Sequence, residues 1–269
     1  MNDDLIQAVR DKSAILFVGA GVSINLGLPS FSQLIQQLAS ELHYDPEIFS
    51  SQGDYLTLAE YFLIEKGTIG PLRSWLDRTW HEGRDIAKSE VHRLIVELGF
   101  PIIYTTNYDA FLERAYKHYG APYVKIANVG DLIGLRPGAT QIVKFHGDFE
   151  DDASIVLTES SYFERLNFET PLDIKLRSDL LGRSVLFIGY SISDVNIRYM
   201  LYRLQRLWES SAYAKARPKS YVFLAHPNPV QERILLNRNI VPIVSEFDEA
   251  AHGLEDFLKR LAHDALGYR

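Results

Sequence analysis

Five short strand-like runs limit the possible folds of this 269-residue chain more than any other feature. Each run is rich in β-branched or aromatic residues and has the length of a strand that is buried on both faces of a parallel sheet. Turn-forming or helix-starting residues (Gly, Asn, Asp, Ser or Pro) follow each run. The five predicted strands are Ile15–Val18, Pro101–Tyr104, Gln141–Phe145, Val185–Ile188 and Tyr221–Leu224.

Helical patterns separate these runs. Apolar residues recur at helical spacing after the second run and again after the fourth. The first set is Phe111, Leu112, Ala115 and Tyr119, and the second is Ile197, Met200, Leu201, Leu204 and Leu207. Strands that alternate with helices predict an α/β fold, here a Rossmann-like doubly wound parallel sheet.

Two segments are longer than a crossover between neighbouring strands requires. The segment at about 31–98 carries apolar stripes at helical spacing, so we expect a helical lobe there, and a shorter insertion at about 147–182. Because 46% of the residues are hydrophobic, the chain holds enough apolar material for one sizeable core. We therefore expect residues 1–269 to form a single domain with helical insertions.

The composition excludes several classes of function. The chain has no cysteine, so a Cys-ligated zinc module is excluded and we expect no metal. A net charge of −7 argues against direct nucleic-acid binding, which relies on clustered Lys and Arg. The apolar runs are too short to cross a bilayer, and the acidic, polar N-terminus does not resemble a signal peptide. These features predict a cytoplasmic protein with no membrane segment.

A glycine-rich turn, Gly-Ala-Gly-Val-Ser, follows the first predicted strand. Gly19 and Gly21 allow a tight turn in which peptide N–H groups at a helix start can approach a pyrophosphate, and Ser23 adds a hydroxyl donor. The usual dinucleotide fingerprint requires a third glycine where this chain has Ile24, which disfavours an ordinary dehydrogenase. From the glycines alone, a turn without any ligand is an equal alternative.

Three more polar segments follow predicted strands, and each also has a purely structural interpretation. Asn107 and Asp109 are placed to meet a ligand at the carboxyl end of a parallel strand, but they also suit a helix N-cap. His146 has the residue type that exchanges protons near neutrality, or it binds only a backbone carbonyl. Gly189 and Ser191 allow close backbone approach and offer a hydroxyl, or belong to another helix cap. Four such segments at four strand ends are much less expected by chance than one.

Together these segments resemble the sirtuin-like family, and most closely its prokaryotic anti-phage defence branch, whose members hydrolyse NAD rather than deacetylate protein. The Gly-Ala-Gly-Val-Ser turn and the later Gly-Leu-Pro-Ser-Phe resemble the sirtuin glycine loop. Thr-Thr-Asn-Tyr-Asp at 105–109 is similar to the sirtuin Thr-Gln-Asn-Ile-Asp segment, and Lys-Phe-His-Gly-Asp at 144–148 to the segment with the catalytic His. The segment that begins Phe-Ile-Gly-Tyr-Ser at 187–191 resembles a late segment of the defence branch. The resemblance extends from Ile15 to a strand near Ile243.

The resemblance implies a role for each matching residue. Those expected at the phosphates, the nicotinamide ribose and the adenosine side of NAD are Gly19, Ala20, Gly21, Ser23, Thr106, Gly189 and Ser191. Those expected to be catalytic are Asn107 and Asp109, beside the nicotinamide ribose, and His146 as general base.

Two departures from the sirtuin pattern bear on the reaction. The zinc cysteines are absent, and the glycine loop ends in Phe31-Ser32 where deacetylases usually have Phe-Arg. The resemblance therefore implies an NAD+ hydrolase, a regulated anti-phage effector that takes NAD as its substrate, uses no metal and releases nicotinamide and ADP-ribose. The alternatives are an NAD-dependent protein deacylase and a non-catalytic NAD or ADP-ribose sensor subunit. The family further implies a homo-oligomer and a HerA-type ATPase or another defence-system partner.

Overall fold

A seven-stranded parallel sheet forms the centre of the computed structural model, which describes residues 2–23, 26–28, 31–166, 169–190, 192 and 195–267. The strand order is β3-β4-β2-β1-β5-β6-β7. The order reverses at β1, since later strands are added on both of its sides, as in doubly wound folds. The strands are β1 (Ala14–Val18), β2 (Ile102–Thr105), β3 (Tyr123–Ile126), β4 (Thr140–Lys144), β5 (Ser184–Ile188), β6 (Ser220–Leu224) and β7 (Ile240–Val244).

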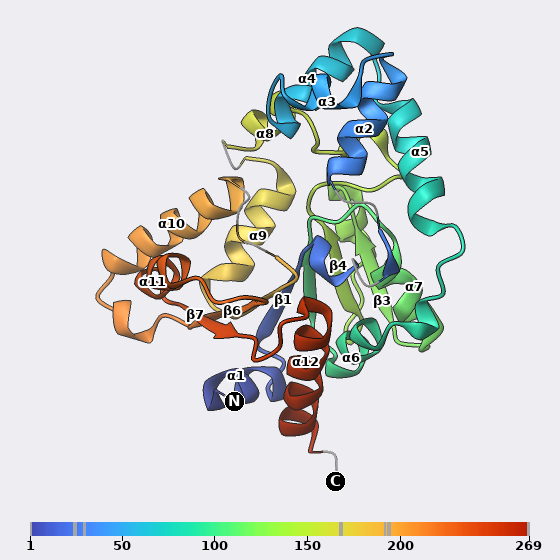
Figure 1. The fold of residues 1–269 in the computed structure, drawn as a ribbon. Coiled ribbons are helices and arrows are strands. Elements are labelled where there is room, and N and C mark those ends of the chain that lie inside the picture. Colours follow the sequence, from blue (N-terminus) through green and yellow to red (C-terminus); the bar gives the residue numbers. More distant parts are fainter. Residues whose placement is uncertain are drawn as a thin grey trace.

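Helices cover both faces of this sheet (Figure 1). One face carries α1 (Asp3–Arg10), α6 (Glu90–Leu98), α7 (Phe111–His118) and α12 (Ala250–Leu266). The other face carries α9 (Pro171–Leu181), α10 (Val195–Glu209) and α11 (Pro229–Asn237). Successive residues of β1 point to opposite faces, so Leu16 joins the first apolar core and Phe17 the second. The predicted Rossmann-like doubly wound sheet is confirmed.

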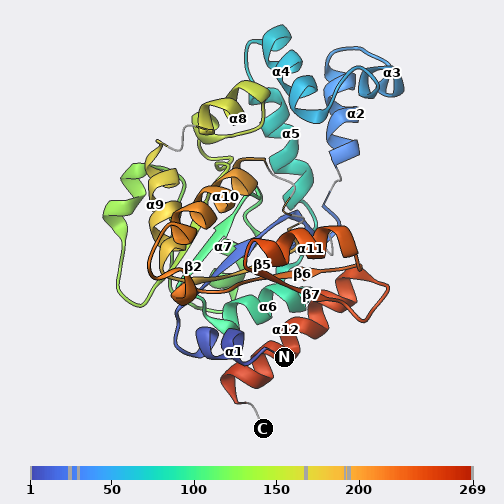
Figure 2. The same cartoon turned by 90° about the vertical axis from the view of Figure 1, so that its left-hand side faces the viewer.

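A helical lobe stands at the end of the molecule away from α1 and α12 (Figures 1 and 2). It consists of α2 (Phe31–Glu41), α3 (Pro46–Ser50), α4 (Tyr55–Lys66) and α5 (Gly70–His81). An apolar cluster of its own holds it together and includes Phe149 and Leu157 from the later insertion, whose helix α8 (Glu159–Arg165) packs against α4. The expected lobe range of 31–98 also contains α6, which packs on the sheet because Leu94 and Ile95 belong to the sheet core.

The sequence predicted only one of the two edge strands. β7 contains Ile243, where a strand was expected, whereas β3 was not predicted. β3 is short and mostly half-buried, with Lys125 in its middle, whereas the inner strands are almost entirely buried. Short 3-10 helices connect several elements, namely η1 (Ala20–Val22), η3 (Ile86–Lys88), η4 (Val129–Gly134), η5 (Asp152–Ser154) and η6 (Ala214–Ala216). In the described part of the chain, no helix is long and apolar enough to span a membrane.

Candidate functional site

The carboxyl ends of β4, β2, β1 and β5 are neighbours, because these strands are adjacent in the sheet in that order. They are the four strand ends that polar or glycine-rich segments follow in the sequence. In doubly wound sheets, ligands bind outside the carboxyl ends of the strands, where the strand order reverses. The fold therefore brings the four predicted segments to one edge of the sheet, around β1.

The glycine turn after β1 packs directly against the turn after β5. The N–H of Gly19 donates to the carbonyl of Ile188 (3.0 Å), and that of Gly21 donates to the carbonyl of Gly189 (2.8 Å). A Cβ on Gly21 would lie 2.8 Å from the Cα of Gly189, which itself has a φ of +57°. Both residues must therefore be glycine for the two backbones to approach this closely.

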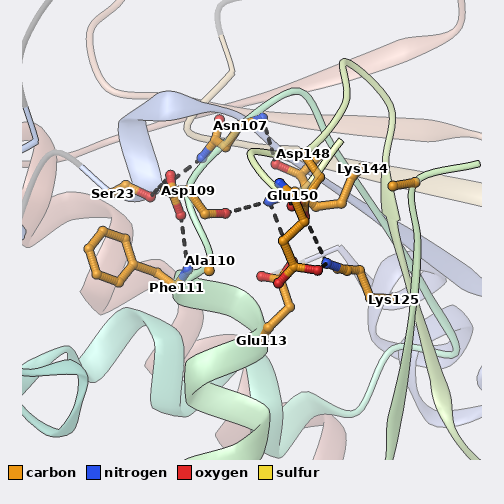
Figure 3. A network of polar contacts seen from close by, with 12 residues as sticks. Ser23, Asn107, Asp109, Ala110, Phe111, Glu113, Lys125, Lys144, Asp148 and Glu150 are labelled. Atoms are coloured by element: carbon orange, nitrogen blue, oxygen red, sulfur yellow. Dashed lines mark hydrogen bonds and ion pairs between the residues drawn. The ribbon is translucent and has the colours of Figure 1, made fainter. Parts of the chain in front are cut away.

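Asn107 links the segment after β2 to the glycine turn (Figure 3). Its side-chain amide donates to the backbone carbonyl of Gly19 (3.2 Å) and to the hydroxyl oxygen of Ser23 (3.4 Å). Its backbone N–H donates to the side chain of Thr105 (3.0 Å), which fixes the start of the loop. The Asn107 side chain is thus directed at the glycine turn and does not cap α7.

Asp109 completes this network. The hydroxyl of Ser23 donates to Oδ2 of Asp109 (3.1 Å), and Oδ1 accepts from the N–H of Phe111 (3.1 Å), the first residue of α7. One carboxylate therefore binds the first N–H of α7, whose N-cap residue is Ala110, and also holds the glycine turn through Ser23. Ser23 and Asp109 are buried, and hydrogen bonds to a carboxylate are strong where water is excluded.

His146 lies directly after β4 and is buried, with 3% of its surface exposed. Its Nδ1 lies 3.4 Å from the hydroxyl oxygen of Tyr162 on α8, and the two rings meet edge to face. Gly147 has a φ of +95° and packs so closely on Ser154 that a side chain there would clash. The sequence did not indicate Tyr162, because only the folded insertion brings α8 to this histidine.

The remaining predicted residues are distributed as follows. Ala20 begins η1, and Thr106 is half-buried beside Asn107. Ser191 lies outside the described residues. The ring of His146 meets the rings of Tyr162 and of its own neighbour in the chain, Phe145. The structure thus joins the glycine turn, Ser23, Asn107 and Asp109 by direct contacts, and brings His146 to the same sheet edge from β4.

A buried histidine behind the site makes stability depend on pH. His92 lies 2.7 Å from the hydroxyl of Ser89, and burial lowers its pKa to about 4, although the charge of Asp109 acts in the opposite direction. An unfolded histidine has a pKa of about 6.5, so the unfolded chain binds the proton first as the pH falls. His92 therefore contributes its full stabilisation above about pH 6.5. As the pH falls from there to about 4, the free energy of unfolding decreases by up to about 3 kcal/mol.

Urea unfolding at about pH 7 and about pH 5 measures this effect. The control variant His92→Asn keeps a polar atom near Ser89 but does not titrate. We expect the free energy of unfolding of the parent protein to fall more steeply with acid than that of the variant. Equal pH slopes for the two proteins would contradict the assignment.

A doubly wound parallel sheet with polar turns at adjacent carboxyl ends defines the class of Rossmann-like α/β proteins. Within this class, the chain belongs to the family described as "SIR2-like domain", whose family model matches residues 101–243. This range includes Asn107, Asp109, His146 and Gly189, while the glycine turn precedes it. The predicted sirtuin-like family is confirmed.

Curated relatives carry names that describe an activity. "NAD(+) hydrolase ThsA" of Cytobacillus dafuensis is 32% identical over 206 residues, which are 76% of this chain and 40% of that protein. The Enterococcus faecium protein of the same name is 33% identical over 200 residues, 72% of this chain and 40% of its own length. "Defense-associated sirtuin 2" of Bacillus subtilis is 25% identical over 243 residues, 87% of this chain and 23% of that protein. The chain thus spans less than half the length of these relatives.

A solved structure supports the same fold. It is described as a mutant Sir2 homologue in complex with ADP-ribose, and it superposes with a TM-score of 0.55 over 100% of this chain and 99% of that chain. The two sequences are 14% identical, so the likeness concerns the fold alone.

Proposed function

We propose that this chain is an NAD+ hydrolase domain, which cleaves the nicotinamide–ribose bond and releases nicotinamide and ADP-ribose. One observation carries the proposal: the Asn107 amide, the Ser23 hydroxyl and the Asp109 carboxylate form one buried network against the glycine turn. That network lies at the sheet edge where ligands of such folds bind. The names of the ThsA relatives support the same reaction.

The reaction requires little acid catalysis. The bond between ribose C1′ and the nicotinamide nitrogen breaks, and the nitrogen keeps the electron pair, so nicotinamide leaves as a neutral molecule. The oxygen of water bonds to C1′ and its proton passes to His146, which returns it to solvent. Positive charge develops on the ribose between these events, and preorganised dipoles and a carboxylate stabilise it.

Each predicted residue has a place in this scheme. Asn107 orients the water or the ribose hydroxyls, and Asp109 supplies negative charge and holds Ser23, which in turn accepts a hydrogen bond from Asn107. NAD is the substrate, and the scheme needs no metal. The residues proposed to bind NAD remain Gly19, Ala20, Gly21, Ser23, Thr106, Gly189 and Ser191.

A product assay tests the proposed function. The purified chain is incubated with NAD+, with and without an acetylated peptide, and nicotinamide, ADP-ribose and acetyl-ADP-ribose are quantified by mass spectrometry. We expect nicotinamide and ADP-ribose in equal amounts without peptide. Release only in the presence of peptide would identify a deacylase, and binding of NAD+ without release would identify a sensor; either result would overturn the proposal.

The wider role is also a proposal. We propose that the chain acts as a regulated anti-phage effector, in keeping with the name of the Bacillus subtilis relative. The expectations of a single domain over 1–269, a homo-oligomer, a HerA-type ATPase or other defence partner, and a cytoplasmic location stay predictions. Light scattering and co-purification from the source cells test the oligomer and the partner.

A further inference from the structure

A lysine with no exposed surface lies beneath the loop that carries Asn107 and Asp109. Lys144 is the last residue of β4, and its ammonium donates a hydrogen bond to the backbone carbonyl of Asp109 (Figure 3). The same ammonium lies 3.4 Å from Oε1 of Glu113, a buried residue in α7. An ammonium buried at this depth is costly unless its surroundings hold it in place.

The position of Lys144 in the sheet makes it a connector between two segments of the site. Lys144 pairs with Thr105 of β2, and the N–H of Phe145 donates to the Thr105 carbonyl (2.8 Å). Two residues beyond Lys144 is His146, and two residues before its acceptor Asp109 is Asn107. One side chain therefore ties the segment of the proposed general base to the loop of the proposed water-orienting amide.

If the side chain at position 144 served only to pack the core, an apolar residue would suit its surroundings better than Lys144. Ile142 points to the same face of β4 and lies in the apolar core. Burial raises the pKa of the Glu113 carboxyl, and the charge of Lys144 acts against this rise. Burying the charges of both Lys144 and Glu113 is thus costly. The hydrogen bond from Lys144 to the Asp109 carbonyl connects this ion pair to the candidate site.

A second ion-pair group lies on the segment that follows β4. Lys125 on β3 lies 3.2 Å from Asp148 and 2.5 Å from Glu150, and Asp148 follows His146 by two residues. These contacts hold the segment after β4 from its outer side (Figure 3). Lys125 thus contacts the segment after β4, whereas the ammonium of Lys144 contacts the backbone of the Asn107–Asp109 loop.

We propose that Lys144 is a positioning residue, whose ammonium fixes the Asp109 carbonyl and thereby sets the Asn107 amide and the Asp109 carboxylate relative to the reacting ribose. The proposal rests on the proposed NAD+ cleavage. A displacement of about 1 Å at a reacting group can cost about a hundredfold in rate. Loss of the ammonium is therefore expected to lower kcat by about tenfold to a hundredfold, with a smaller change in KM.

Three variants separate positioning from folding. Lys144→Met removes the charge and keeps the length of the side chain, while Lys144→Met combined with Glu113→Gln also removes the carboxyl left without its cation. Lys144→Arg keeps a cation and is expected to recover part of kcat. The matched control is Lys175→Met, since Lys175 is also paired with a carboxylate, Asp179 at 2.7 Å, but is only partly buried and lies on α9. This control is expected to keep the parent kcat.

Two readouts keep the outcome decisive. Kinetics on folded protein should show the fall in kcat for both Lys144→Met variants, and parent kcat in the folded double variant would overturn the proposal. Hydrogen exchange should show faster exchange of the backbone amides at 106–111 in Lys144→Met, and unchanged exchange would overturn it. If the parent protein itself releases no nicotinamide, the proposed function fails, while the exchange measurement still decides whether Lys144 anchors the loop.

Discussion

Replacing His146 with alanine is expected to lower kcat for NAD+ cleavage by about 10²–10⁴-fold, the usual contribution of a general base. Asn107→Ala should cause a loss of similar size, because the amide that orients the nucleophile disappears. The reason lies in the site: Asn107 is held by Gly19 and Ser23, and His146 is buried at the neighbouring strand end. Initial rates of nicotinamide release from saturating NAD+ measure both effects.

Two controls accompany this measurement. His118→Ala changes an exposed histidine at the end of α7, and it should retain the parent rate. The Kd of each variant for NAD+, measured by calorimetry, should remain within about tenfold of the parent value if the residues act mainly in the transition state. Parent-like rates in both His146→Ala and Asn107→Ala would show that the catalytic assignment is wrong.

The sheet could be predicted from the sequence because its inner strands are buried on both faces. Each inner strand is then a short run rich in β-branched or aromatic residues, and the polar segment after it marks the carboxyl end. β3 does not follow this rule, since it lies at the edge of the sheet and is mostly half-buried. The candidate site was predictable to the same extent, because its residues follow those strands directly.

Contacts between distant segments were not predictable in this way. Gly19 and Gly21 suggested phosphate binding, yet the structure also gives them a packing role against Gly189, far away in the sequence. Lys144 belongs to the Lys-Phe-His-Gly-Asp segment, but the sequence indicated no role for it, because its acceptor Asp109 lies on another strand's loop. Tyr162 belongs to the insertion, where no apolar run indicated which strand end it would meet.

Arg165→Met is expected to lower the free energy of unfolding by about 3–5 kcal/mol, the cost of leaving a buried charge without its partner. The guanidinium of Arg165 donates to Oδ1 of Asp173 from two nitrogens (3.1 and 2.6 Å), and Asp173 has no exposed surface. A third nitrogen donates to the carbonyl of Phe145 (2.8 Å), directly before His146. The variant thus leaves one carboxylate and one carbonyl without their buried donor.

The free energy of unfolding in urea, compared between the parent protein and variants that keep its m-value, tests this expectation. Arg165→Met combined with Asp173→Asn should recover a large part of the loss, because the neutral amide no longer requires a cation. The matched control is Arg260→Met, which removes an exposed partner of Asp256 and should cost less than about 1 kcal/mol. If Arg165→Met lowers the free energy of unfolding as little as Arg260→Met does, the buried pair of Arg165 and Asp173 does not hold the segment before His146. If the large loss is observed, this pair supports the histidine from one side while the hydrogen bond from Lys144 to Asp109 secures the loop of Asn107 from the other.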